Sequence, residues 1–373
     1  MGLRDGRDKV GYAVVGEGYI AQAAVLPAFA HARRNSRLAA LVSGDREKLR
    51  TLGRRYGVTR LYSYDEYDEC LAGGEVDAVY IALPNDMHRE YSVRAAHAGI
   101  HVLCEKPMAV TEQDCLAMIE AAERNRVKLM VAYRLHFDPA NLAAVEAAQS
   151  GRLGDLRLFT STFTMQVEEG NIRLLRARGG GTLYDIGIYC INAARYLFQD
   201  EPVEALARTV AGAEGRFREV EEAASAILRF PGGRVASFTC SFGSSDVSAY
   251  RLCGTKGDLL AEPAYEYAED LVLRIRAGGR TRRRTFARHD QFAPELLHLS
   301  DCILKGTEPE PSGREGLVDV QIIEALYRSA REGRPVPLTL PSRGRRPGPG
   351  QAISRPPVEK PRMVKAKSPS GRE

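Results

Sequence analysis

Residues 9–21 read KVGYAVVGEGYIA, an apolar run that ends in a glycine-rich turn. The apolar run is typical of a buried strand, and the turn has the pattern Gly16-x-Gly18-x-x-Ala21. In such a turn the first glycine makes the bend, the second lets backbone approach a pyrophosphate, and the small third residue lets a helix pack on the strand. The N-terminus of that helix then faces the phosphates. The residues expected to contact a dinucleotide here are Gly16, Gly18, Tyr19 and Ile20.

Strand and helix patterns alternate after this turn, with a strand about every 20 to 30 residues. Alternation of this kind predicts a doubly wound parallel sheet. We assign residues 1–133 to a Rossmann domain of this α/β type. Its further strands are predicted at 36–43, 76–84, 100–106 and 128–133, and its helices at 19–32, 46–57, 86–99 and 111–125.

The pattern changes after residue 134, where long segments alternate between apolar and polar residues. The stretch FPGGR at 230–234 is typical of a hairpin turn between two of them. We therefore expect residues 134–340 to form an α+β domain with a large, mostly antiparallel open sheet, for substrate binding and oligomerisation. RTRRR at 280–284 is interpreted as a charged edge strand. The other strands of this α+β domain are predicted at 155–167, 224–230, 234–242, 248–254 and 270–276, and its last helix at 313–333.

Composition and charge limit the classes of function. The 373 residues carry a net charge of +5, but the stretch 341–373 alone holds nine Lys or Arg and two Glu. This tail is rich in Pro and Gly and poor in apolar residues, so we expect it to be disordered. No apolar run approaches the roughly 20 residues of a membrane helix, and the N-terminus lacks a signal-peptide pattern. We therefore expect a cytoplasmic protein, with at most a weak contact between its tail and nucleic acid.

The seven cysteines are scattered and none forms a CxxC pair. An odd, dispersed set is typical of reduced, buried thiols rather than of a disulfide framework or a zinc site. We expect no metal ion.

The end of the second predicted strand indicates which dinucleotide binds. NAD-binding enzymes usually place an acidic residue there, to hold the ribose 2′-hydroxyl. Here Ser43 and Gly44 stand at that position, and Arg46 and Lys48 follow. A hydroxyl and two cations suit a 2′-phosphate, so NADP is favoured and NAD is the alternative. Asp45 is expected to cap the next helix.

Three residues are candidates for the chemistry. Lys106, in CEKPM at 104–108, lies at the end of a predicted parallel strand, where open α/β sheets bind ligands. Asp185 and Tyr189 follow three glycines in GGGTLYDIGIYC (179–190), and their i, i+4 spacing places them on one helix face. A tyrosine near an ammonium group can act as a general base. The glycines are expected to let the backbone approach the ligands closely.

These motifs together resemble the glucose–fructose oxidoreductase/inositol dehydrogenase (Gfo/Idh/MocA) family over residues 9–336. The resemblance includes LPNDMH (83–88), CEKPM, YRLHFDP (133–139), NIRL (171–174) and GGGTLYDIGIYCINAARYL (179–197). Most of the family has a histidine where this chain has Tyr189, and tyrosine is similar to the glucose–fructose oxidoreductase branch. The resemblance implies Lys106, Asp185 and Tyr189 as the catalytic group.

The resemblance also implies contacts from the neighbouring segments. The implied further cofactor contacts are Leu83, Pro84, Asn85, His88, Glu105, Lys106 and Arg134. The implied substrate contacts are Lys106, Arg134, His136, Asp185 and Tyr189. It further implies that the open sheet exposes apolar and aromatic side chains that pair into homodimers or homotetramers.

The function predicted from these residues is NADP-dependent hydride transfer at C1 or a ring carbinol of a sugar or cyclic polyol. Tyr189 would take the hydroxyl proton, Lys106 would stabilise the oxyanion, and Asp185 would orient Lys106 or the sugar. A variant of this function retains NADP between an aldose and a second sugar, as in aldose–ketose oxidoreductases. The alternative from another class is a non-catalytic NADP-binding sensor or scaffold.

Overall fold

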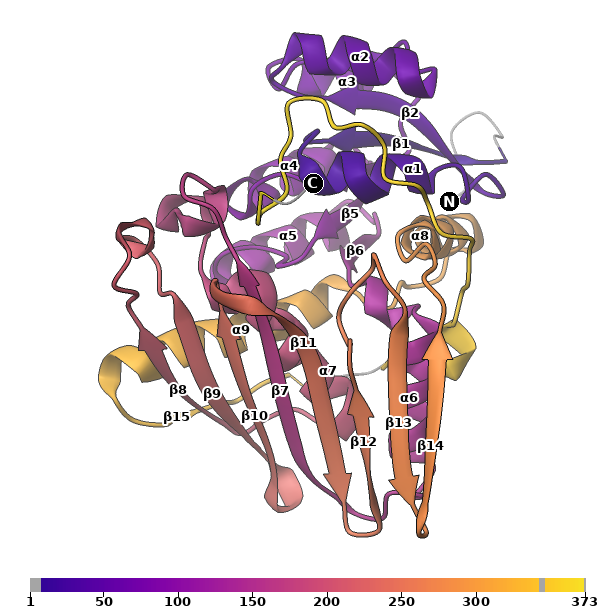
Figure 1. The fold of residues 1–373 in the computed structure, drawn as a ribbon. Helices are drawn as coiled ribbons and strands as arrows, with labels where there is room; N and C mark the ends of the chain where they lie inside the picture. The colour runs from indigo at the N-terminus through magenta and orange to yellow at the C-terminus, as the bar shows by residue number, and fades with distance from the viewer. Residues whose placement is uncertain (1–7, 342–345, 372–373) are drawn as a thin grey trace.

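The chain forms two β-sheets in the computed structural model, which describes residues 8–341 and 346–371 (Figure 1). The first sheet has six strands in the order β3-β2-β1-β4-β5-β6, and every neighbouring pair is parallel. This confirms the predicted doubly wound sheet. Its strands are β1 (Val10–Val15), β2 (Ser36–Val42), β3 (Leu61–Tyr62), β4 (Ala78–Ile81), β5 (His101–Glu105) and β6 (Leu129–Ala132).

Helices cover this sheet, and α2 and α5 begin at capping residues that the sequence indicates, whereas α3 was not predicted. Asp45 caps α2 by accepting hydrogen bonds from the backbone N–H groups of Glu47 and Lys48 at 3.0 Å. Thr111 caps α5 in the same way, through the N–H of Asp114 at 3.1 Å. Both caps satisfy amide groups that a helix leaves unpaired at its start. The helices of this layer are η2 (Ala21–Val25), α1 (Leu26–Ala28), α2 (Arg46–Tyr56), α3 (Tyr67–Ala72), η3 (Asn85–Met87), α4 (His88–His97) and α5 (Glu112–Arg124).

The second sheet has nine strands in the order β14-β13-β12-β11-β7-β10-β9-β8-β15. Only the pair β7–β10 is parallel among its described neighbours, so the predicted mostly antiparallel sheet is confirmed. The arginine-rich stretch forms the edge strand β14, as predicted. The strands of the second sheet are β7 (Leu156–Gln166), β8 (Glu204–Val210), β9 (Ala223–Phe230), β10 (Arg234–Ser241), β11 (Gly243–Gly254), β12 (Gly257–Ala261), β13 (Leu271–Ala277), β14 (Arg280–Phe286) and β15 (Val336–Pro337).

Helices pack on one face of this second sheet and leave the other face open (Figure 1). Side chains at alternate positions point to opposite faces of a strand, so the buried Phe159 lies on the helix side and the exposed Thr160 on the open side. The helices on the covered face are α6 (Pro139–Gln149), α7 (Ile188–Phe198) and α9 (Gly313–Glu332).

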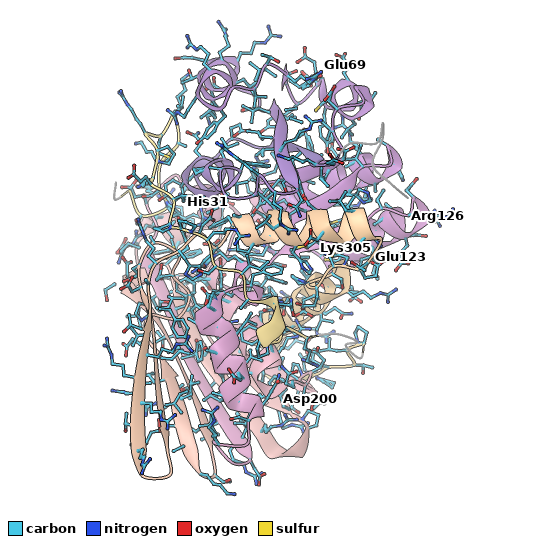
Figure 2. All side chains as sticks on the ribbon, turned by 90° about the vertical axis from the view of Figure 1, so that its right-hand side faces the viewer. His31, Glu69, Glu123, Arg126, Asp200 and Lys305 are labelled. Carbon is cyan, nitrogen blue, oxygen red and sulfur yellow. The ribbon has the colours of Figure 1, made fainter. Side chains whose placement is uncertain are left out.

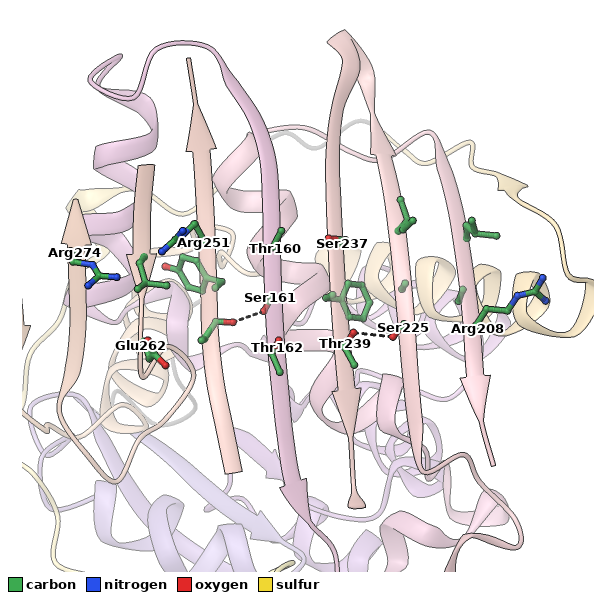
Figure 3. Close-up of a pocket in the computed structure, with 18 residues that line it drawn as sticks. Thr160, Ser161, Thr162, Arg208, Ser225, Ser237, Thr239, Arg251, Glu262 and Arg274 are labelled. Carbon is green, nitrogen blue, oxygen red and sulfur yellow. Dashed lines mark hydrogen bonds between the residues drawn. The ribbon is translucent and has the colours of Figure 1, made fainter. Parts of the chain in front are cut away.

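The open face carries both polar and apolar side chains. It carries a shallow hollow of about 810 Å³ lined largely by hydroxyl and arginine side chains, including Thr160, Thr162, Ser225 and Arg251 (Figure 3). Exposed apolar side chains do occur on the sheet, and Ile227 is 45% exposed. Two aromatic residues, Phe238 and Tyr250, are among those that line the hollow, whereas Phe159 and Phe163 occupy the opposite set of positions and are buried.

One helix from late in the chain belongs to the first layer. Helix α8 (Ala293–Lys305) packs against β1 and β2, and Figure 2 shows it crossing the molecule between the two sheets, with Lys305 at its end. The hydroxyl groups of Tyr12 and Ser36 lie 2.9 and 2.8 Å from the hydroxyl of Ser300. No helix in residues 8–341 or 346–371 has the length and apolar character needed to cross a membrane.

The tail differs from its predicted disorder over residues 346–371, here called the C-terminal segment. It is extended, and it hydrogen-bonds to the body of the protein, for example from the Ile353 N–H to the Phe137 carbonyl at 3.0 Å. Ile353 and Val364 pack against the apolar cluster around β1. The prediction considered only the composition of the tail, whereas its order comes from polar groups that the folded body presents. Residues 342–345 and 372–373 of the predicted tail lie outside the described residues.

Candidate active site

A cleft of about 890 Å³ lies between the carboxyl ends of the parallel strands and the end of the second sheet. The glycine-rich turn forms one end of this cleft. Gly16 has a φ of +95°, and a Cβ there would lie 2.6 Å from the carbonyl oxygen of Ala82. A Cβ on Gly18 would meet no atom within 4 Å, so the backbone at Gly18 faces open space. This is the cradle that a pyrophosphate requires, and Tyr19 and Ile20 line the cleft beside it.

Glu17 is a buried carboxylic acid inside this turn. It is 2% exposed, and neither of its carboxylate oxygens has a hydrogen-bond partner. Burial raises the pKa of Glu17 from 4.5 to about 8, although the charge of Lys48 acts in the opposite direction. A neutral carboxyl group can face phosphates without the repulsion that a carboxylate would cause.

Glu17→Gln is expected to change the pH dependence of stability in the nucleotide-free protein. Because the folded-state pKa is raised, the folded protein holds a proton that the unfolded chain releases between pH 4.5 and 8. Stability therefore falls as pH rises through this range, by up to ~4 kcal/mol. Glutamine cannot ionise. The free energy of unfolding of the variant, relative to that of the wild type, should therefore be higher at pH 8.5 than at pH 5. Urea unfolding at both pH values measures this, and an equal difference at both would contradict it.

The residues predicted for the adenosine end divide into two groups. Ser43 and Lys48 line the cleft, as a site for the 2′-substituent of the cofactor requires. Gly44 and Arg46 are exposed and do not line it, so their contact with the cofactor stays a prediction. Arg46 lies in the first turn of α2, on the side of that helix facing solvent.

The opposite end of the cleft brings Lys106 and Asp185 together. The Lys106 ammonium group donates to the Asp185 backbone carbonyl at 2.7 Å and to its carboxylate at 3.2 Å. Arg173 Nε donates to the other carboxylate oxygen at 2.6 Å. Burial tends to raise the pKa of Asp185, but the charges of Arg173 and Lys106 outweigh burial and lower it to about 2. Asp185 is therefore a carboxylate over the whole range in which an enzyme works.

Lys106 itself is a stable cation. Burial acts to lower its pKa, but the charges of Asp185 and Tyr189 act against burial, and the pKa is raised above 10.5. Its Nζ atom lies 4.9 Å from the centre of the Tyr189 ring. A permanent positive charge therefore stands beside the phenol, where negative charge would develop if the phenol lost its proton.

A second cation, Arg134, contacts the same phenol. Its guanidinium group donates to the Tyr189 hydroxyl at 3.3 Å and lies 5.2 Å from the ring centre. Arg134 is 6% exposed and is held by the Tyr265 carbonyl and by Gln291. The rings of Phe163 and Tyr265 pack against Tyr189. The phenol is therefore fixed in position between two cations.

The segments after β4 and β5 complete the middle of the cleft. Leu83, Pro84, Asn85 and Glu105 all line it. Asn85 donates to the Gly179 carbonyl at 2.8 Å and so joins the two halves of the site. Burial raises the pKa of Glu105, whose carboxylate accepts from the Tyr80 hydroxyl at 2.8 Å.

The structure differs from the predictions for two histidines. His136 is fully buried, and its ring nitrogens lie 3.0 Å from Glu310 and 2.7 Å from Asn192. His88 is also fully buried, and its ring nitrogens lie 2.9 Å from the carbonyl oxygens of Leu83 and Pro107. Neither lines the cleft. Both have their polar atoms engaged by the protein, so they support the segments of the site from behind rather than contact a ligand.

The glycines at 179–181 also have a role in packing, beside the predicted approach to the ligands. Gly179 and Gly180 do line the cleft, but a Cβ on Gly180 would lie 2.3 Å from the carbonyl oxygen of Arg173. The N–H of Gly181 donates to that same carbonyl at 3.0 Å. The glycines therefore let this loop fold closely on itself, which brings Arg173 to Asp185.

Profiles of known families match both halves of the chain. A family described as "Oxidoreductase family, NAD-binding Rossmann fold" matches residues 10–133, and "GFO/IDH/MocA C-terminal domain" matches residues 141–260. The chain is 32% identical over 329 residues to "D-xylose 1-dehydrogenase [NADP(+)]" of Haloarcula marismortui, covering 86% of this chain and 91% of the relative. The chain belongs to the Gfo/Idh/MocA oxidoreductase family.

Other members of the Gfo/Idh/MocA family are similar over most of the chain. The crystal structure of aldose-aldose oxidoreductase from Caulobacter crescentus, complexed with glycerol, is 44% identical, with a TM-score of 0.85. That match covers 88% of this chain and all of the other. D-apiose dehydrogenase of Paraburkholderia graminis is 30% identical, covering 81% of this chain and 83% of the relative.

Some residues of this Gfo/Idh/MocA site were not predicted. Arg173 belongs to the NIRL stretch, which indicated that this segment resembles the family. The stretch did not indicate that Arg173 contacts Asp185. Glu17 stood between two predicted glycines, where its burial could not be seen from the sequence. Lys360 and residues 368–370 line the cleft from the C-terminal segment, and no pattern in the sequence indicated that.

Within the described ranges, no group of three His, Cys, Asp or Glu side chains is arranged to hold a metal ion. The seven cysteines are all free thiols. The polar groups of the cleft are thus amino, guanidinium, carboxyl, amide and hydroxyl groups, which suit hydrogen bonds to a polyhydroxylated ligand.

Proposed function

We propose that the protein transfers hydride between NADP and a sugar or cyclic polyol, at C1 or at a ring carbinol. The observation that carries this proposal is the meeting of Lys106, Asp185 and Tyr189 in the same cleft as the glycine-rich turn. The relatives support the choice of substrate, since their names describe enzymes acting on D-xylose, D-apiose and aldoses. NADP is favoured over NAD because Ser43 and Lys48 line the cleft at the end of β2.

NADP, when bound, supplies the nicotinamide ring that accepts hydride from the substrate carbon. Tyr189 receives the proton of the substrate hydroxyl group, so that a C1 hydroxyl becomes a lactone carbonyl and a ring carbinol becomes a ketone. For this step Tyr189 must start as a phenolate, which the charges of Lys106 and Arg134 stabilise, and the same cations stabilise the negative charge that develops on the substrate oxygen. Asp185 holds Lys106 in position through its backbone carbonyl and its carboxylate.

The cleft has room for both reactants. Its lining includes the glycine-rich turn at one end and Tyr189 at the other, with Asn85 and Lys106 between them. Holding two reactants in a fixed geometry lowers the barrier by removing the entropy of bringing them together. In this arrangement residues 83–85 would hold the nicotinamide, and Tyr189 would face the hydroxyl group of the sugar.

The first experiment is a mixing assay. Purified protein is combined with NADP or with NAD and a panel of aldopyranoses and inositols, and the absorbance of the reduced nicotinamide is followed. Steady turnover with one sugar and NADP is expected. A burst limited to one equivalent of enzyme, relieved by adding a second aldose, would assign the variant in which NADP stays bound. Dinucleotide binding with no reaction on the whole panel would contradict the proposed substrate class.

We also propose that two copies associate through the open face of the nine-stranded sheet. Exposed apolar side chains such as Ile227 and Leu158 stand among hydroxyl groups on its strands. Analytical ultracentrifugation of the wild type and of Ile227→Lys tests this, because a lysine at an interface would favour the monomer. An unchanged sedimentation coefficient would contradict it.

A further inference from the structure

The C-terminal segment is tied directly to the glycine-rich turn. The side-chain amide of Gln22 donates to the carbonyl oxygens of Glu17 and Val364, each at 2.9 Å. The backbone N–H of Val364 donates back to Gln22 at 2.8 Å. Gln22 is fully buried, so these bonds are shielded from water. Residue 364 is therefore positioned by the same side chain that closes the turn.

The segment then reaches the end of β2, where the 2′-substituent of the cofactor is expected. The Lys365 ammonium group lies 3.2 Å from the Asp45 carboxylate and 2.7 Å from the Glu47 carboxylate. The pKa of Asp45 is lowered, first by the hydrogen bond from the Lys48 backbone, with a contribution from Lys365. Asp45 is thus ionised. Without Lys365, the carboxylates of Asp45 and Glu47 would have no ion-pair partner among the described residues at the end of β2.

Two more parts of the segment line the cleft itself. Lys360 Nζ lies 5.5 Å from the centre of the Tyr19 ring, at the start of the helix that follows the glycine-rich turn. Residues 368–370 line the far side, and the Pro369 carbonyl accepts from the Glu168 N–H, just beyond β7, at 2.9 Å. The segment therefore lines the cleft at two places, and Figure 1 shows its path as the yellow trace that passes α1.

We propose that the C-terminal segment is part of the dinucleotide site, with Lys365 setting the preference for a 2′-phosphate and Lys360 serving the phosphates common to both dinucleotides. This inference rests on the proposed function. Lys365 acts by neutralising Asp45 and Glu47, whose charges would otherwise repel a 2′-phosphate while leaving a 2′-hydroxyl unaffected or favoured. Lys360 acts as a cation inside the cleft, near the helix N-terminus that faces a pyrophosphate.

Binding of NADP and of NAD to the full-length protein tests the proposal, by calorimetry because the chain has no tryptophan. Lys365→Ala is expected to weaken NADP binding about 3- to 10-fold at low salt while changing NAD binding little, since exposed charges contribute modestly and are screened. Adding Asp45→Asn to Lys365→Ala is expected to restore much of the lost NADP affinity, because asparagine still caps α2. Lys360→Ala is expected to weaken both dinucleotides to a similar degree.

Lys367→Ala is the matched control, because Lys367 is an exposed lysine of the same segment that, unlike Lys365, forms no ion pair with Asp45 or Glu47. It should leave both dissociation constants unchanged. If Lys365→Ala behaves like Lys367→Ala in a wild-type background that binds NADP, this inference is overturned and the proposed function stands. If the wild type binds neither dinucleotide, the proposed function fails and this inference fails with it.

Discussion

Tyr189→Phe is expected to lower kcat by about 10²- to 10⁴-fold, the usual contribution of a general base. The phenylalanine keeps the ring that packs on Phe163 and Tyr265 and lies near Lys106. It loses only the hydroxyl group that receives the proton. The Kd for NADP should stay at the wild-type value, since the glycine-rich turn lies at the other end of the cleft. Steady-state kinetics with the sugar identified by the mixing assay, together with calorimetry, measures both quantities.

Tyr184→Phe is the control for this variant. Tyr184 lies on the same helical segment, and its hydroxyl donates to the Val110 carbonyl at 2.7 Å outside the cleft. Its loss should leave kcat near the wild-type value. Turnover by Tyr189→Phe equal to that of Tyr184→Phe would refute the role of Tyr189 as the base.

Lys106→Met is expected to lower kcat by about 10²- to 10³-fold, as for removal of one group that stabilises a developing oxyanion. Methionine has a similar length and carries no charge. The variant leaves Tyr189 with one neighbouring cation, Arg134, and leaves the Asp185 carboxylate with Arg173. Because the lost interaction strengthens as charge develops, the change should be found mainly in kcat rather than in KM.

Lys128→Met controls for the loss of a partly buried ion pair. The Lys128 side chain is 16% exposed and pairs with Glu308, whereas the Lys106 side chain is 14% exposed and pairs with Asp185. Of these two lysines, only Lys106 lines the cleft. Thermal unfolding of both variants measures the loss of stability, and steady-state kinetics measures the loss of kcat. If Lys128→Met lost as much activity as Lys106→Met, the effect would be one of stability and the assigned role would fail.

The sequence predicts five of the six strands of the first sheet because those strands are largely buried, whereas the two-residue strand β3 is only half-buried and was not predicted. Such buried strands are continuous apolar runs, and β2 and β5 are followed by helices with recognisable caps, Asp45 and Thr111. The open sheet was harder to predict in detail. Alternation in residues 155–167 marks a strand with two different faces, but the polarity of the exposed set, such as Thr160 and Thr162, governs how that face interacts with a partner.

The candidate site could be predicted where its residues follow strand ends, as Lys106 does. It could not be predicted where function depends on burial or on distant contacts. His136 and Glu17 have sequence neighbours typical of a site, but both side chains are buried. His136 lies within hydrogen-bond distance of Glu310, and the carboxyl group of Glu17 has no hydrogen-bond partner among the described residues. The contact between Gln22 and Val364 joins residues 342 positions apart. No local pattern in the sequence encodes a contact of that range.

The placement of α8 has a consequence for the order in which the protein can fold during synthesis. Its buried Leu296 and Leu297 cover β1 and β2, and Asn35 donates to the Leu297 carbonyl at 2.9 Å. The nascent dinucleotide-binding half must therefore wait for about 170 further residues, which takes on the order of ten seconds or more at about 5–20 residues per second. Until then the apolar surface that α8 covers is exposed on the ribosome, so we expect this half to aggregate when it is expressed as an isolated fragment.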